Sequence, residues 1–143
     1  MKESESMITK AIRLRGKRDL RLEEFQLPEM GDDEIIAHVV SNSICMSSHK
    51  AVVQGSDHKR VHEDIHEHPP IIGHEMCGEI VSVGSKWAHK YKPGDGFAIQ
   101  PAHFYKGSLM APGYSYKYIG GDATYIVIPS EVMETGSLLA YKG

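Results

Sequence analysis

The sequence predicts a mainly-β fold, a barrel or a sandwich, with few and short helices. Several short runs are rich in β-branched residues, and turns built on glycine and proline separate them at close intervals. Almost no stretch shows the period of an amphipathic helix. With 143 residues, the chain has the size of one domain and is long enough to enclose a hydrophobic core.

The first two strands are predicted as a hairpin. Residues 9–16 and 19–27 are short alternating runs, and a polar turn that contains Gly16 separates them. Other runs of high β propensity predict further strands at 33–44, 79–84, 96–101 and 123–129. Between the strands at 33–44 and 79–84 we expect one internal helix. Ser47 or Ser48 can cap its first turn, and Gly55 marks its end.

Composition and charge exclude several classes of protein. The formal net charge of -3 leaves no surplus of Lys and Arg to neutralise phosphates, so we expect no nucleic-acid partner. No apolar run approaches the roughly 18 to 20 residues that span a bilayer, so we expect no membrane partner. The start of the chain lacks the apolar core of a secretory signal, which predicts a cytoplasmic protein with a disordered polar tail over residues 1–7.

A histidine and a glutamate stand side by side just before a strand-like run. His74 and Glu75 follow Gly73 and precede Gly78, and these glycines allow the backbone to bend so that both side chains face one site. A solvent-facing β-turn explains the tripeptide equally well on its own. Cys45 favours a metal site over a solvent-facing turn, because it ends a strand-like run at the start of the predicted helix, where a thiolate is favoured. A thiolate, an imidazole and a carboxylate together form a set that a catalytic zinc accepts.

Four segments, in order, resemble those of one family. The stretch "GHEMCGEIVSVG" matches the signature of the medium-chain zinc-dependent dehydrogenases, and "SICMSSHK" resembles the segment with their first zinc-ligand cysteine. "KPGDGFAIQP" and "GGDATYIVIP" resemble two further stretches of their GroES-like catalytic domain. The resemblance covers residues 8 to about 130, is greatest to members that act on sugar alcohols, and implies a GroES-like, partly open β-barrel over residues 8–143.

The resemblance implies a role for each site residue. Cys45 and His74 would ligate a catalytic Zn²⁺, and Glu75 would be a ligand or a group that exchanges with zinc-bound water. Ser47 would relay the proton of the substrate alcohol while hydride moves to NAD(P). Two positions depart from the family: Ser48 stands where Asp is common, and Lys50 stands where a relay histidine is common, with His49 one residue earlier.

Part of the family pattern is missing from these 143 residues. No G-x-G-x-x-G follows a strand, so the Rossmann coenzyme domain is absent from this chain, and we expect the chain alone to be inactive. In a longer parent, we expect a homo-oligomeric oxidoreductase that acts on a sugar alcohol or sugar phosphate. A phosphate would need a cation, for which Lys50, Lys106 and Lys117 are unranked candidates. Two other readings stay open: a non-enzymatic GroES-like binding or assembly module, and a small metal-binding protein.

Two features are expected to be structural. His58, His62 and His66 are spaced four residues apart, but their segment has little apolar content and ends at two prolines, so a solvated loop or an exposed helix is predicted rather than a metal clamp. Two cysteines cannot form a disulfide framework, and Cys77 is predicted as a buried packing residue.

Overall fold

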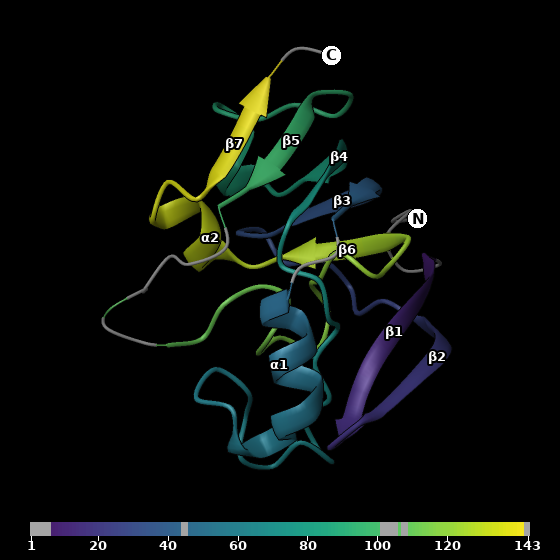
Figure 1. Ribbon diagram of the computed structural model, residues 1–143. Helices are drawn as coiled ribbons and strands as arrows, with labels where there is room; N and C mark the ends of the chain where they lie inside the picture. Colours follow the sequence, from purple (N-terminus) through teal and green to yellow (C-terminus); the bar gives the residue numbers. More distant parts are fainter. Residues whose placement is uncertain (1–6, 44–45, 101–105, 107–108, 142–143) are drawn as a thin grey trace.

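The computed structural model describes residues 7–43, 46–100, 106 and 109–141, and the described part is mainly β (Figure 1). In chain order the strands are β1 (Ile8–Gly16), β2 (Asp19–Gln26), β3 (Ile35–Asn42), β4 (Met76–Val83), β5 (Gly96–Ile99), β6 (Tyr125–Ile128) and β7 (Leu138–Tyr141). The helices are α1 (Met46–Gln54) and α2 (Ser130–Glu134), with short 3-10 turns η2 (Gly55–Asp57) and η3 (Ser85–Trp87). None of the helices in the described part has the length and apolar character that a membrane crossing requires.

Two antiparallel sheets make up the fold. β1 and β2 form the predicted hairpin, and the other strands form a sheet in the order β6-β3-β4-β5-β7. Register shifts interrupt the β3–β4 ladder at two places, which bends that pair. Isolated bridges from Ala11 to Ala123 and from Arg13 to Ile71 attach the hairpin to the segments that precede β6 and β4, and the described strands do not close a barrel. The predicted partly open, mainly-β fold is confirmed.

The main core lies on one face of the larger sheet and includes α2. Alternate residues of the strands supply it, as expected for a sheet with one buried face. Its largest fully buried members are Tyr91, Phe97, Ile35, Ile80, Ile119, Ile126, Ile128 and Met133. A smaller cluster joins α1, through Ala51, to the loop that follows it and to Tyr114. This second cluster carries the site described below.

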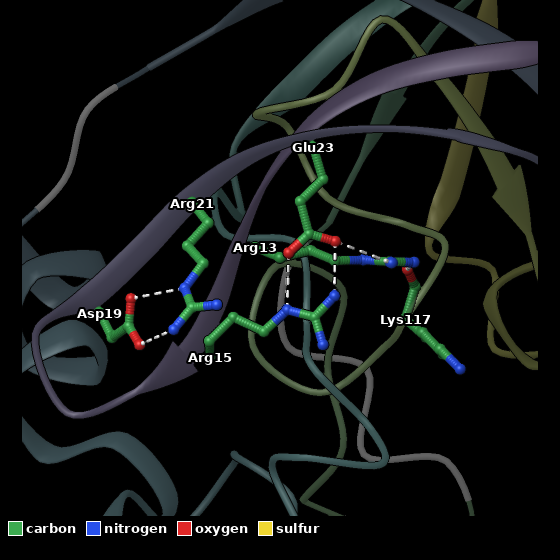
Figure 2. Close-up of polar contacts among 6 residues, drawn as sticks. All are labelled: Arg13, Arg15, Asp19, Arg21, Glu23 and Lys117. Carbon is green, nitrogen blue, oxygen red and sulfur yellow. Dashed lines mark hydrogen bonds and ion pairs between the residues drawn. The ribbon is translucent and has the colours of Figure 1, made fainter.

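A buried arginine connects the hairpin to the rest of the fold (Figure 2). The Arg13 guanidinium lies 3.6 Å from the centroid of the Phe25 ring and donates a hydrogen bond of 2.8 Å to the backbone carbonyl of Lys117. Glu23 lies 3.5 Å from Arg13 and accepts two hydrogen bonds from Arg15. Because Arg15 bonds to the Glu23 carboxylate, the pKa of Glu23 is below its usual value. The planar guanidinium can stack and donate at once, which an ammonium cannot do.

The predicted elements are largely present, with shifted ends. The strands expected at 33–44 and 96–101 span 35–42 and 96–99, and the strand expected at 79–84 begins earlier, at Met76. The expected helix is α1, and it ends before Gly55, whose φ of 55° suits glycine. Residues 1–6 of the expected tail lie outside the described part. Met7 was also assigned to that tail, but its backbone carbonyl accepts a hydrogen bond from the Leu27 amide and its side chain packs against the hydrophobic cluster that contains Leu27.

Candidate functional site

The turn that carries His74 is enclosed by backbone. Gly73 has a φ of 101°, and its carbonyl accepts a hydrogen bond of 2.6 Å from the Gly121 amide. Gly113, with a φ of 88°, approaches so closely that a Cβ there would lie 2.6 Å from the His74 Cα and would collide with the Gly73 carbonyl. Glycine is therefore required at both positions, by conformation and by space. The sequence prediction that glycine lets the chain bend at His74 is confirmed at Gly73.

His74 is buried, with 8 % of its surface exposed, and two hydroxyls contact one nitrogen of its ring. The Tyr114 hydroxyl lies 3.2 Å from Nδ1, and the Ser48 hydroxyl lies 3.4 Å from the same atom. The Tyr114 ring also stacks on the imidazole, with centroids 5.2 Å apart. These contacts fix the ring orientation on the Nδ1 side, so that Nε2 points toward the opposite side, where Glu75 lies.

Burial lowers the pKa of His74 below its usual value, and the nearby Glu75 carboxylate opposes this effect only partly. The imidazole is therefore neutral near pH 7, and neutral imidazole is the form that ligates a metal ion.

Glu75 is on the exposed side of the same turn. Its Oε1 lies 4.0 Å from His74 Nε2 and accepts a hydrogen bond of 2.8 Å from the Ser43 hydroxyl. The Ser43 amide also donates to the Glu75 carbonyl, at 3.0 Å, which ties this turn to the end of β3. A hollow of about 320 Å³ lies beside Glu75, with Ser43 and Asn42 in its lining. A small polar ligand has access to the carboxylate from this hollow.

The remaining predicted site residues come from the start of α1. Cys45 lies outside the described residues, and of Ser47 the structure describes only the backbone, in the first turn of α1. His49 and Lys50 are exposed on that helix. Within the described part, no three His, Cys, Asp or Glu side chains converge as a metal-binding group.

The donors that the structure does describe fit a zinc ion. His74 offers a buried neutral imidazole held by hydroxyls on its other nitrogen, and Glu75 offers a carboxylate on the side of Nε2. Imidazole and carboxylate are both zinc ligands, and zinc ligands in proteins are commonly oriented by such outer hydrogen bonds.

The histidine-rich segment after α1 is a turn-rich loop, which is one of the two forms that the sequence predicted for it. His62 and His66 are exposed, but His58 is buried at 8 % exposure, which was not expected. Val61 and Ile65 hold the loop in the second core cluster, so the segment has more apolar anchoring than its composition suggested.

His58 stacks on Tyr114, the residue whose hydroxyl contacts His74. Its ring is nearly parallel to Tyr114, with centroids 5.4 Å apart. Burial lowers the pKa of His58, and the positive charges of Lys50, Arg60 and Lys59 lower it further. The three rings His58, Tyr114 and His74 therefore form a continuous stack that joins the loop to the candidate metal ligand.

An amide–carboxyl pair supports the His74 turn from behind, and sequence reasoning did not find it. The Asn42 side-chain amide donates to Asp122 Oδ1, and burial raises the pKa of Asp122. Asn42 Oδ1 is buried and has no hydrogen-bond partner among the described residues. A Cβ on Gly121 would collide with this side chain, so the pair sits directly against the backbone of the turn. The two residues are 80 positions apart, and no local pattern indicates their contact.

Tyr114 was also missed, because the sequence offers it only as one of several tyrosines between residues 105 and 125. Cys77 is half-buried in β4 rather than fully buried, and it is the free cysteine of the described part. Its neighbours in the sheet are Ser41 and Ala98, so it packs within the strand region as expected but is less enclosed.

Comparison with known proteins places the fold and the motifs. Residues 31–135 match the model of the alcohol dehydrogenase GroES-like domain. Over 135 residues the chain is 54 % identical to L-sorbose 1-phosphate reductase of Klebsiella pneumoniae, covering 94 % of this chain and 33 % of that protein. It is 44 % identical to mannitol-1-phosphate 5-dehydrogenase of Aliivibrio fischeri, covering 94 % and 32 %. The chain thus spans about a third of the length of these curated relatives.

Solved structures agree on the fold. The crystal structure of 2R,3R-butanediol dehydrogenase from Bacillus subtilis superposes with a TM-score of 0.71 at 24 % identity, covering 92 % of this chain and 40 % of that one. The resemblance to dehydrogenases seen in the sequence is confirmed, including its greater likeness to the sugar-alcohol members. Because the family model covers well over half of the sequence, the chain belongs to the alcohol dehydrogenase GroES-like domain family.

Proposed function

We propose that this chain is the substrate- and zinc-binding part of a longer NAD(P)-linked oxidoreductase that interconverts a sugar or sugar-phosphate ketone and its polyol. The names of the relatives support the substrate class, since L-sorbose 1-phosphate reductase and mannitol-1-phosphate 5-dehydrogenase both act on phosphorylated six-carbon sugars or sugar alcohols. The length of these relatives supports a coenzyme-binding part beyond the segment that this chain matches. A cytoplasmic, homo-oligomeric parent is part of the same proposal.

The observation that carries the proposal is the geometry of His74. A buried neutral imidazole is held on Nδ1 by Tyr114 and Ser48, while Nε2 is turned toward the Glu75 carboxylate. Cys45, which directly precedes α1 and is three residues before Ser48 in the chain, would supply the thiolate. When bound, a zinc ion supplies Lewis-acid polarisation of a carbonyl and favours the alkoxide form of an alcohol.

The residues of this chain would orient the ligands and move the proton. Tyr114 and Ser48 hold the His74 ring, so the ligand nitrogen needs no reorientation on metal binding. Glu75, held by Ser43, would act as a ligand or as the group that exchanges with water. Ser47 would accept the proton of the substrate hydroxyl and pass it toward solvent, as a hydroxyl in contact with both can do.

Metal content tests the proposal directly. We expect the purified chain to hold zinc, and we expect Cys45→Ala and His74→Ala each to lose most of it. His66→Ala is the matched control, because His66 is an exposed histidine of the loop and its removal should leave the zinc content unchanged. Equal zinc content in all four proteins, or loss in the control as well, would remove the metal site from the proposal.

Activity provides a second test. The 143-residue chain alone should show no NAD(P)-dependent oxidation of a polyol, whereas the longer parent protein should oxidise one. Detectable turnover by the purified chain would show that the nicotinamide site does not lie in the part of the relatives that this chain does not match.

A further inference from the structure

The end of β3 turns two serines to the face of the larger sheet that lies away from the core. Val39 packs against the main core, so strict alternation along the strand would direct Ser41 and Ser43 to the core as well. The register of β3 against β4 shifts between Val39 and Ser41, and Val40, the residue between them, is 69 % exposed. Ser41 and Ser43 are exposed as a result. A bulge of this kind commonly re-aims side chains beside an active site.

The pairing partners of these residues agree with the change of face. Asn42 is in register with Met76, a buried member of the main core, and residues directly opposite each other in a sheet share a face. Ser41 is in register with Cys77, and Cys77 is in register with Ala98, which places these three residues in one row across the outer face. Consecutive residues of β3 thus face opposite sides, with Ser41 on the exposed one.

All three residues of this row line the hollow of about 320 Å³ that lies beside Glu75. Ser41, Ser43 and Glu75 contribute hydroxyl and carboxylate groups to its lining, and Ala98 and Ile99 contribute apolar surface. Small-molecule sites in proteins have volumes of about 300–1,000 Å³ and combine apolar walls with a few placed polar groups. The hollow is therefore large enough for a small ligand that carries both hydroxyl groups and a carbon chain.

The two serines retain hydrogen-bonding capacity for such a ligand. The Ser43 hydroxyl donates to Glu75 Oε1 at 2.8 Å, so its lone pairs can accept from a ligand hydroxyl. The Ser41 hydroxyl has no hydrogen-bond partner among the described residues, so it can both donate and accept. Because an extended chain rises about 3.3 Å per residue, serines two positions apart lie about 6–7 Å from each other. The carbon chain of a hexitol can span this distance and present a hydroxyl to each serine.

The hollow adjoins the side of His74 on which we place the metal. Glu75 Oε1 lies 4.0 Å from His74 Nε2 and is the atom that accepts from Ser43. A ligand whose reacting carbon lies at the proposed metal therefore extends past Glu75 into the hollow, without passing Tyr114 on the Nδ1 side. The larger hollow of about 450 Å³ has neither His74 nor Glu75 in its lining, so it does not adjoin the proposed metal.

We propose that Ser41 and Ser43 bind hydroxyl groups of a sugar alcohol or an open-chain sugar whose reacting carbon lies at the metal proposed beside His74. This inference rests on the proposed function, and it deepens it by naming residues that distinguish a polyol from an alcohol with fewer hydroxyls. Ser43 accepts from one hydroxyl of the ligand, and Ser41 exchanges a hydrogen bond with another hydroxyl farther along the chain. Ala98 and Ile99 contact the carbon chain.

Titration of the zinc-loaded chain with two ligands tests this subsite. Sorbitol carries a hydroxyl on every carbon, whereas 1,2-propanediol carries a pair that can reach the metal and is too short to meet Ser41 as well. Binding is followed by backbone amide shifts, and sorbitol should shift residues 40–43, 75–78 and 98–99. Ser41→Ala should weaken sorbitol binding about two- to tenfold, the range expected for one hydrogen bond, and should leave binding of 1,2-propanediol unchanged.

Two further variants separate the Ser41 hydroxyl from a general effect on the sheet. Ser41→Thr keeps the hydroxyl in a residue that suits a strand, so it should bind sorbitol nearly as tightly as the wild type. Ser82→Ala is the matched control, because Ser82 is a serine of the neighbouring strand β4 that does not line the hollow. Equal weakening by Ser82→Ala, no weakening by Ser41→Ala, or no sorbitol-induced shift in residues 40–43 would overturn the subsite.

Zinc content distinguishes failure of the subsite from failure of the proposed function. Ser41 is not a proposed metal ligand, so Ser41→Ala should hold as much zinc as the wild type. Loss of zinc in Ser41→Ala would assign the weaker sorbitol binding to the metal and overturn the subsite. A wild-type chain that takes up no zinc would refute the metal site of the proposed function. If the wild type holds zinc and Ser41→Ala binds sorbitol equally well, the subsite alone is wrong.

Discussion

The Tyr114 hydroxyl lies 3.2 Å from Nδ1 of His74, and the two rings stack with centroids 5.2 Å apart. This contact joins two segments that are 40 residues apart in the sequence. Ser48 stands where the family commonly has Asp, so that Tyr114 and Ser48 both present neutral hydroxyls to the imidazole. A hydroxyl holds the imidazole without adding charge beside the proposed metal.

Removing this hydroxyl should weaken metal binding while leaving the fold intact. We expect Tyr114→Phe to reduce zinc affinity about tenfold, the lower end of the effect of outer-shell partners, because the Ser48 hydroxyl remains. Affinity is measured by competition with a chelator, and the absorption spectrum of the cobalt-substituted chain reports ligand geometry.

Tyr91→Phe is the matched control for this prediction, because it deletes a tyrosine hydroxyl that contacts the Leu138 carbonyl far from His74. A cobalt spectrum and a zinc affinity that are the same in Tyr114→Phe as in the wild type would mean that Tyr114 merely fills space. Addition of Ser48→Ala to Tyr114→Phe should weaken zinc binding further.

Gly113 tests the close approach of backbone to His74. Gly113→Ala places a Cβ 2.6 Å from the His74 Cα at a φ of 88°, so we expect a loss of at least about 3 kcal/mol in the free energy of unfolding, together with weaker zinc binding. Gly94→Ala has a similar φ of 92° but nothing within 4 Å of its Cβ, and should lose only about 1–2 kcal/mol. Urea denaturation gives both values, and equal losses would contradict a steric contribution.

Two of the arginines drawn in Figure 2, Arg13 and Arg21, should respond differently to the same change. Arg13→Lys loses the stacking on Phe25 and the fork that serves both Glu23 and the Lys117 carbonyl, so we expect about 2–3 kcal/mol of destabilisation. Arg21→Lys affects only a fully exposed pair with Asp19 and should change stability little. Similar thermal denaturation of the two variants would refute the structural role of Arg13.

Asp122 makes stability depend on pH in a stated direction. Burial raises its folded pKa above its ordinary value of 3.8, so its contribution to stability is full below that value and is lost as pH rises through the folded pKa. Asp122→Asn removes this loss and adds an amide donor beside Asn42 Oδ1, which has no hydrogen-bond partner among the described residues. We expect the variant to be more stable than the wild type at pH 7, by on the order of 1 kcal/mol.

The comparison is repeated at pH 3.5, where wild-type Asp122 is protonated and its hydroxyl can itself donate to Asn42. The advantage of Asp122→Asn should shrink there. Denaturant unfolding of both proteins at the two pH values measures it, and an advantage that is unchanged or larger at pH 3.5 would contradict the assignment.

The features that could be predicted from the sequence are those determined by residues close together in the chain. Runs of β-branched residues gave the strands because alternate side chains must face one core, and the glycines around His74 marked a bend because only glycine accepts its dihedral angles. β7 and α2 were not predicted, because four or five residues are too few to show a period. Their place is set by pairing with β5 and by burial of Val132 and Met133.

The unpredictable part of the site lies in contacts between distant segments. The sequence singled out His74 and Glu75. It did not indicate the contact of Tyr114 with His74 or the hydrogen bond from Asn42 to Asp122, because each joins residues far apart in the chain. His58 is buried only because the loop around it folds onto Tyr114, which its polar neighbours did not indicate. Whether Cys45 reaches His74 stays a prediction, since Cys45 lies outside the described residues.

The backbone turn that carries His74 is enclosed by the peptide groups of Gly73, Gly113 and Gly121, while the side chains of Tyr114 and Ser48 contact its ring. Mutations at surface positions that touch neither these glycines nor Tyr114 and Ser48 should therefore leave the imidazole where it is. Such a scaffold lets residues on the rim of the site be exchanged while the imidazole keeps its position. It also makes those three glycines positions at which an inherited substitution is poorly tolerated.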